Sequence, residues 1–141
     1  MLTNTPTTRN HVISLKEAID LTRRFRKNRR VITKDEFEDK HILPLAETFD
    51  KEAFRRFMDN ENCKGIRIYL GMKEDCTIHS VIVGVDVNNR DMLPKDSTLQ
   101  TQAFATEITD TTNDVEIVDN GYRCPPDCPP ASDLNTDLPQ P

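Results

Sequence analysis

Two neighbouring segments with strand-like patterns constrain the fold more than any other part of the chain. In residues 65–71, GIRIYLG, apolar residues occupy every second position, which is the period of a strand covered on one face. Residues 77–86, TIHSVIVGVD, are apolar on both faces, as expected of a central strand. Asparagine tolerates positive φ, so Asn88 and Asn89 suit a reversal that leads into residues 90–93. The pattern predicts an antiparallel meander of three or more strands.

Helical patterns precede these strands. Ser14 and Glu17 have the spacing of a capping box, and apolar residues recur at helical spacing behind them. A helix is therefore predicted from Ser14 to near Asn28, followed by a short helix over residues 34–40 and another over residues 50–60. The sequence predicts an α+β fold in which two or three N-terminal helices pack on a small antiparallel sheet.

The apolar residues that could build a core are unevenly distributed. They make up 35% of the chain, less than in most globular proteins, and concentrate between residues 13 and 93. Residues 101–108 and 115–118 are weaker strand candidates. Residues rich in Thr, Asn, Asp and Pro dominate both ends, a composition typical of disorder. We predict a disordered N-terminus (1–12), a single α+β domain (13–119) and a disordered Cys/Pro-rich tail (120–141).

A run of basic residues raises the possibility of phosphate binding. Seven Lys and Arg residues without an intervening acid could contact a nucleic-acid backbone. Four acidic residues follow within residues 35–39, the net charge is −5, and no helix-turn-helix pattern is present. We interpret the run as a solvated helix end and expect no nucleic-acid partner; its members are Arg23, Arg24, Arg26, Lys27, Arg29, Arg30 and Lys34.

The sequence predicts a cytoplasmic protein outside the membrane. Residues 1–10 lack the apolar stretch of a secretory signal, and the longest apolar run, residues 81–83, is far too short to span a bilayer. Reducing conditions in the cytoplasm would keep the four cysteines as thiols.

Cys124 and Cys128, within the segment CPPDCPP, are the most unusual pair of side chains. Two thiolates could ligate a soft metal or form a reversible disulfide, although structural zinc sites use four ligands. The alternative is a proline-stiffened tail in the polyproline II conformation, in which Pro126 and Pro129 meet an aromatic groove of a partner. We favour the tail, and we expect no cofactor.

Arg67, Tyr69 and His79 could cluster on the polar side of the predicted hairpin. A His and Tyr pair could transfer protons, because histidine titrates near neutral pH. No nucleophile or paired carboxylate accompanies them, and the common motifs of nucleotide and hydrolase sites are absent. Cross-strand packing explains the same residues, which we treat as candidates for binding a partner.

Three stretches together resemble a known family: the strand GIRIYLG at residues 65–71, VGVD at residues 83–86, and CPPDCPP at residues 124–130. They are similar to a family of small Bacteroidota proteins that has no established activity, and the similarity covers most of residues 14–130. The resemblance implies a bacterial, cytosolic protein and assigns no catalytic residue. Residues 29–45 are more charged than this family would lead us to expect.

These observations favour a non-enzymatic module that binds an unidentified protein through a sheet edge or surface and through its tail, with self-association as a further possibility. The alternatives are a metal- or redox-responsive protein that uses Cys124 and Cys128, and a small enzyme that uses His79 and Tyr69.

Overall fold

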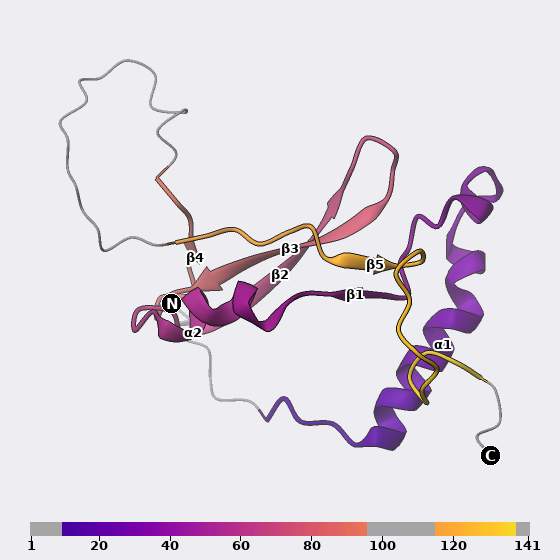
Figure 1. Ribbon diagram of the computed structural model, residues 1–141, viewed down its shortest axis with the longest axis horizontal. Coiled ribbons are helices and arrows are strands. Elements are labelled where there is room, and N and C mark those ends of the chain that lie inside the picture. The colour runs from indigo at the N-terminus through magenta and orange to yellow at the C-terminus, as the bar shows by residue number, and fades with distance from the viewer. Residues whose placement is uncertain (1–9, 96–114, 138–141) are drawn as a thin grey trace, which may run out of the picture. The chain divides into compact units, whose positions relative to one another are not determined.

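A computed structural model describes residues 10–95 and 115–137, and its fold is mixed α+β with antiparallel sheets (Figure 1). The predicted strand at residues 101–108 lies outside the described residues. The described elements, in chain order, are α1 (Leu15–Ile32), the 3-10 helix η1 (Asp35–Lys40), β1 (Ala46–Thr48), the 3-10 helix η2 (Lys51–Phe54), α2 (Arg55–Asp59), β2 (Gly65–Met72), β3 (Ile78–Val85), β4 (Asp91–Met92) and β5 (Tyr122–Cys124).

The chain divides into two compact units. Among the described residues, unit 1 holds residues 50–69, 81–95 and 115–119. Unit 2 holds the remaining described segments, residues 10–49, 70–80 and 120–137. Strands β2 and β3 each run through both units.

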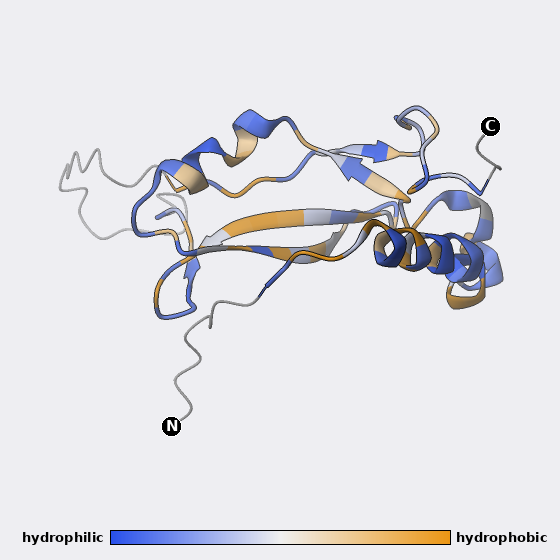
Figure 2. Ribbon diagram, turned by 90° about the horizontal axis from the view of Figure 1, so that it is seen from below, coloured by the Kyte–Doolittle hydropathy of each residue, from blue (hydrophilic) through white to orange (hydrophobic). Residues whose placement is uncertain are grey.

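The core of unit 1 forms where α2 meets β3. Phe57 is 6% exposed, and Ile82 and Val83 are 2% exposed. Gly84 packs closely against Phe57 and the loop before β2: a Cβ atom at this position would be 3.5 Å from Cδ1 of Phe57 and 3.0 Å from the Sγ atom of Cys63. Figure 2 shows orange, hydrophobic stretches on the strands of the β2–β3 hairpin, separated by blue and white ones. Apolar side chains of β3 therefore hold this unit together.

The three-stranded sheet has the order β2-β3-β4. Gly84 pairs with Met92 and Val85 with Asp91, in an antiparallel register. The predicted strand at residues 115–118 is reduced to one antiparallel bridge, in which Val118 exchanges backbone hydrogen bonds of 2.8 and 2.9 Å with Ile82.

Helix α1 begins as predicted and ends later. Ser14 is the N-cap, and its Oγ atom accepts a hydrogen bond of 3.1 Å from the Glu17 amide. The helix continues to Ile32, beyond the predicted end at Asn28. Neither Gly nor Pro interrupts it, and the last turn holds Arg29 and Arg30, whose positive charge the helix dipole favours.

The other predicted helices are present as short elements. Residues 35–40 form η1, a 3-10 helix, and residues 51–59 form η2 followed by α2. Asp50 stands at the N-cap of η2 but makes no side-chain capping hydrogen bond.

A small two-stranded sheet in unit 2 was not predicted. Strand β1 pairs with β5 in an antiparallel register that sets Ala46 opposite Cys124 and Thr48 opposite Tyr122. Only glycine fits at position 121, just before β5, because the Phe49 ring occupies the space of a side chain. A Cβ atom there would lie 2.6 Å from Cζ of that ring. This sheet brings residues near the C-terminus against the segment that follows α1.

Candidate functional site

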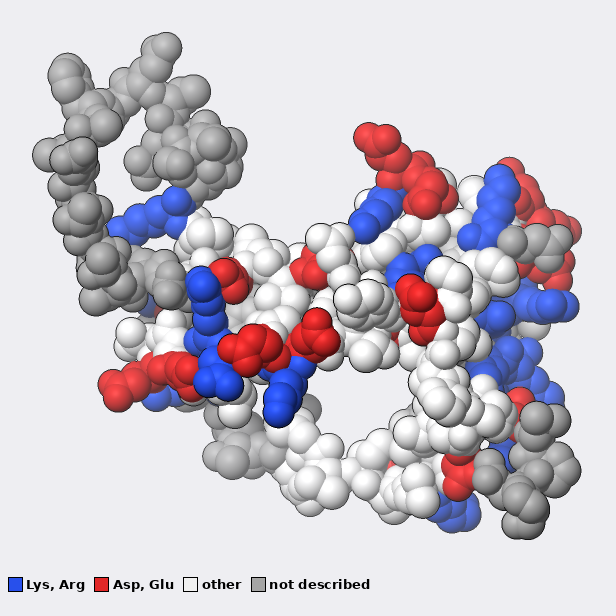
Figure 3. Space-filling view, in the orientation of Figure 1, with Lys and Arg blue, Asp and Glu red and all other residues white. Residues whose placement is uncertain are grey.

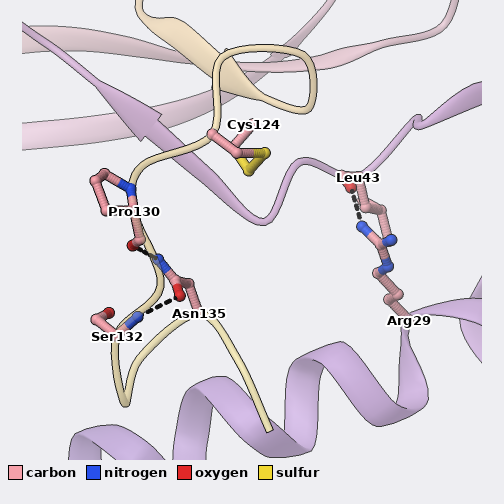
Figure 4. Close-up of a disulfide and its surroundings, with 7 residues drawn as sticks. Arg29, Leu43, Cys124, Pro130, Ser132 and Asn135 are labelled. Atoms are coloured by element: carbon pink, nitrogen blue, oxygen red, sulfur yellow. Dashed lines mark hydrogen bonds between the residues drawn. A yellow bond between two sulfur atoms is a disulfide. The ribbon is translucent and has the colours of Figure 1, made fainter. Parts of the chain in front are cut away.

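The end of β5 carries a disulfide between Cys124 and Cys128 (Figure 4). Cys124 is 3% exposed, whereas Cys128 is exposed. The backbone around the bridge turns back on itself, because the Asp127 amide donates to the Arg123 carbonyl at 2.8 Å. The expectation of four thiols is therefore wrong for this pair, and both sulfurs are bonded to each other rather than available to a metal.

The prediction of a disordered tail from residue 120 is also wrong for residues 120–137. Strand β5, the disulfide and successive turns order this segment. Pro126 and Pro129 are exposed, but internal hydrogen bonds fold the backbone around Pro126, whereas a polyproline II segment has none. The polar and proline-rich composition concealed contacts that come from residues more than a hundred positions away.

Arg26 in α1 makes these long-range contacts. Its side chain is 10% exposed, and its guanidinium donates to the Leu134 carbonyl at 2.5 Å and to the Thr136 carbonyl at 3.3 Å. The same group binds the Asp137 carboxylate at 2.7 Å. Arg26, with a contribution from Arg23, holds the pKa of Asp137 below its usual value. Arg26 thus anchors the C-terminal segment to α1.

A compact turn shapes the segment that Arg26 holds. Figure 4 shows the Asn135 side chain bonded to both Pro130 and Ser132. Its Nδ2 atom donates to the Pro130 carbonyl, and its Oδ1 atom accepts from the Ser132 amide, both at 2.8 Å. Asn135 therefore closes the turn that follows the disulfide.

A groove of about 500 Å³ lies between α1, the start of β1 and this turn. Apolar side chains form most of its wall, with a few polar groups among them. The lining residues, all within unit 2, are Leu21, Thr22, Phe25, Arg26, Leu45, Ala46, Pro129, Ser132, Leu134 and Asn135.

The surface of α1 is strongly basic, and Figure 3 shows Lys and Arg atoms gathered over this helix. Arg23 and Arg26 contact Asp137, and Arg30 contacts Glu38. Arg24 and Lys27 are exposed and make no ion pair within residues 10–95 and 115–137. These two cations are free to attract an acidic molecule.

Arg67 and Tyr69, in unit 1, meet at Asp91 of β4. Arg67 forms an ion pair with this carboxylate, and the Tyr69 hydroxyl donates to it at 2.5 Å. Arg67 also donates to Oδ1 of Asn89 at 2.6 Å. The Tyr69 hydroxyl and the Asp91 carboxylate raise the pKa of Arg67. The cluster links β2 to β4 and to the turn before β4, and it keeps the guanidinium charged.

His79, in unit 2, has different partners from Tyr69. Its Nδ1 atom lies 3.5 Å from Oε1 of Glu47, and its Nε2 atom lies 3.0 Å from the Thr77 hydroxyl. The other oxygen of Glu47 accepts the Ser80 amide at 2.8 Å. The Tyr69 hydroxyl thus bonds to Asp91, whereas His79 contacts Glu47 and Thr77; a proton-transfer pair of His79 and Tyr69 stays the alternative considered above.

Sequence reasoning identified Cys124 and Cys128 but missed the residues that build the groove. Arg26 was assigned to a solvated basic run, and Leu45 and Leu134 lay outside any predicted element. Leu134 is one of two leucines in residues 120–141 and gave only a weak signal, since single apolar residues are common on protein surfaces.

Within the described parts of the chain, no group of three or more His, Cys, Asp or Glu side chains could hold a metal ion. The helices described here are all too short or too polar to cross a membrane. Searches of family models, curated proteins and solved structures found no match to this chain.

Proposed function

We propose that this chain is a non-enzymatic binding module whose groove beside α1 takes a short acidic segment of a partner protein, anchored by one large apolar side chain. The groove itself is the observation that carries the proposal. Its volume of about 500 Å³ falls within the range of roughly 300–1,000 Å³ that is usual for ligand sites.

The lining favours an apolar anchor. Leu21, Phe25, Leu45 and Leu134 offer hydrocarbon surface, and burying a Leu or Phe side chain against such surface contributes about 1.5–3 kcal/mol. Ser132 and Thr22 add hydroxyl groups that can bond to the backbone of a bound peptide. This combination of apolar wall and few polar groups suits a peptide side chain better than a highly charged metabolite.

The charge around the groove favours acidic residues beside that anchor. Arg24 and Lys27 are exposed on the side of α1 turned away from the groove, so they can act on an approaching partner only through their field. Arg26 lines the groove, and its guanidinium is already bound to Asp137. Opposite charges on a partner would steer its approach and fix its orientation. Salt should weaken this contribution, because exposed charges are screened within about 10 Å at 0.1 M ionic strength.

The test begins with selection from a random peptide library displayed on phage. The proposal expects enriched peptides with Leu or Phe flanked by Asp or Glu, and synthetic copies whose fluorescence anisotropy rises on binding. Replacing the anchor by Ala, or the flanking acids by Lys, should weaken binding by about tenfold, which corresponds to about 1.4 kcal/mol.

A pair of protein variants ties that binding to the groove. Ala46→Trp fills the groove and should abolish binding, while Thr48→Trp, on the same strand but outside the lining, should leave it unchanged. Failure to enrich any peptide, or equal binding to both variants, would overturn the proposal.

The disulfide favours a second candidate, a redox-responsive binding module. Pro129, Ser132 and Leu134 form one wall of the groove and follow the disulfide directly. Cys128 is an exposed residue, so we expect its sulfur to be open to attack by a thiolate. An external dithiol would be oxidised to its own disulfide. The Cys124–Cys128 disulfide would take up the two electrons and two protons and become two thiols. The wall formed by Pro129, Ser132 and Leu134 would then no longer follow a covalently closed turn.

The location of the protein decides which redox state prevails. The cytoplasmic location expected from the sequence would favour the dithiol, whereas an oxidising compartment would preserve the disulfide. Peptide binding to the native chain should fall when a phosphine reductant is added, and the double variant Cys124→Ser/Cys128→Ser should bind at the reduced level with or without it. Equal binding by the native chain and the double variant, each with and without reductant, would eliminate redox control.

A further inference from the structure

A second, smaller pocket lies in unit 2 between the last turns of α1, η1 and the loop that follows η1. Its volume is about 60 Å³, and its lining includes Arg29, Arg30, Glu38, His41 and Leu43. One water molecule needs roughly 10–15 Å³ of such space, so the pocket has room for only a few. A small polar group such as a carboxylate fits this space, whereas a larger ligand does not.

Arg29 gives this pocket hydrogen-bond donors that the fold does not use. Figure 4 shows its side chain reaching from α1 to the Leu43 carbonyl, to which it donates at 3.4 Å. A guanidinium carries five N–H donors, and among the side chains that the structure describes Arg29 has no carboxylate partner. Arg29 is also half-buried. A partly buried guanidinium without a counter-charge favours an anionic ligand.

The charges of the lining favour a carboxylate over a phosphate. Arg30 lies 3.6 Å from Glu38, so these two charges largely cancel. Among the Lys, Arg, Asp and Glu side chains of the lining, Arg29 is left with the unbalanced charge. One carboxylate neutralises it and can accept two parallel hydrogen bonds from a guanidinium. A phosphate monoester, with a charge of about −1.5 to −2, would be repelled by Glu38.

The pocket continues the groove along α1. Arg26 lines the groove, and Arg29, three residues later on the same face of the helix, lines the pocket. On the opposite wall, Leu43 lines the pocket and Leu45 lines the groove. A peptide that lies along α1 in the groove therefore meets the pocket at its next few residues.

We propose that the pocket around Arg29 binds a carboxylate of the same peptide that places its apolar anchor in the groove. This inference rests on the proposed function and adds where the acidic group binds. On α1 the groove spans residues 21–26 and the pocket spans residues 29–33, so their centres are roughly 10 Å apart at about 1.5 Å per residue. An extended peptide covers this distance in about three residues. The acid should therefore lie three residues from the anchor.

A series of synthetic peptides tests this spacing. Each peptide has blocked ends and a neutral sequence with one Leu and one Asp, separated by one to six residues in either order. The negative end of the α1 dipole opposes an anion near the last turn, so the expected gain is modest. Fluorescence anisotropy should show roughly tenfold tighter binding at a separation of three than for adjacent residues. Affinity that does not depend on the separation would overturn the proposal.

A pair of protein variants ties the acid to Arg29. Arg29→Gln removes the charge but keeps an N–H donor for the Leu43 carbonyl, and it should bind the best Asp peptide no better than the matching Asn peptide. The Asn peptide should bind this variant and the native chain equally. Arg24→Gln removes an exposed cation from the other side of α1 and should keep the preference for Asp. An unchanged preference in Arg29→Gln would refute the role of the pocket.

Two further peptides identify the source of the carboxylate. Both have neutral side chains and end three residues after the Leu anchor, one with a free and one with an amidated C-terminus. Tighter binding of the free acid assigns the pocket to a terminal carboxylate, whereas a gain only from Asp assigns it to a side chain.

The groove variants keep this test separate from that of the proposed function. If Ala46→Trp abolishes binding of the Leu peptides while Arg29→Gln changes nothing, the groove stands and the carboxylate pocket alone is wrong. If no peptide binds the native chain, both proposals are wrong.

Discussion

The guanidinium of Arg26 binds the carboxylate of Asp137 at 2.7 Å, although 111 positions separate the two residues in the chain. Arg26 also holds two carbonyl groups of the same C-terminal segment. One side chain of α1 therefore converts a polar, proline-rich end of the chain into a wall of the groove.

Removing this anchor should release the wall. In Arg26→Ala the Leu134 and Thr136 carbonyls lose their donor, which we expect to lower the free energy of unfolding by about 1–2 kcal/mol. Hydrogen exchange should show faster exchange of amides 132–137 with little change in β3. Lys27→Ala, a neighbouring basic residue without an ion pair here, should leave that exchange pattern unaltered.

Acid should loosen the same contact. Hydrogen bonding from Arg26 lowers the pKa of Asp137 in the folded state, so its stabilising contribution is present above the unfolded value of about 3.9. The contribution is lost as the pH falls through the lower, folded pKa. Exchange of amides 132–137 should rise in that range, and Asp137→Asn should remove this pH dependence while Asp133→Asn keeps it.

The buried Glu47 side chain should stabilise the fold mainly as a hydrogen-bond acceptor and less through its charge. Its side chain is 6% exposed and accepts the Ser80 amide. Glu47→Ala leaves this amide without an acceptor and should cost about 1–3 kcal/mol in denaturant unfolding. Glu47→Gln retains an acceptor oxygen and should cost less. An equal loss for both variants would show that the charge beside His79 dominates.

Gly121 should not tolerate a side chain. In Gly121→Ala the new methyl group would lie 2.6 Å from the Phe49 ring, so either the ring or β5 must move. We expect a loss of about 1–3 kcal/mol, typical of overpacking. Phe49→Leu should lower the free energy of unfolding by less in the Gly121→Ala variant than in the native chain, because the smaller side chain relieves the crowding. Strictly additive losses would contradict the contact.

Thiol counting tests the disulfide directly. The denatured, unreduced protein should react with a thiol reagent at two cysteines, Cys63 and Cys76. After reduction, all four should react. Peptide mapping of the unreduced protein should find Cys124 and Cys128 in one linked fragment.

Local patterns in the sequence predicted the local parts of this fold. The Ser14 cap and the β2–β3 hairpin depend on residues within a few positions of each other, and both were predicted. Strands β1 and β5 have three residues each, too few to show a period, and their pairing joins distant segments. The sequence could not reveal them.

In the candidate site too, features set by nearby residues could be predicted and features set by contacts between distant segments could not. The unusual spacing of Cys124 and Cys128 drew attention to the right segment, but composition led to the wrong state for it. The groove depends on Arg26 meeting Leu134 and on the β1–β5 register, which are contacts between ends of unit 2. Only three-dimensional proximity turns Leu45 and Leu134 into one surface.

The pairing of β1 with β5 also orders events during synthesis. A ribosome releases α1 and β1 long before residues 122–137, so Leu21, Phe25 and Leu45 have no covering segment until those later residues have been made. A nascent or prematurely stopped chain would display this apolar surface to chaperones and proteases. Unit 2 can therefore assemble only after nearly all of these residues have been translated.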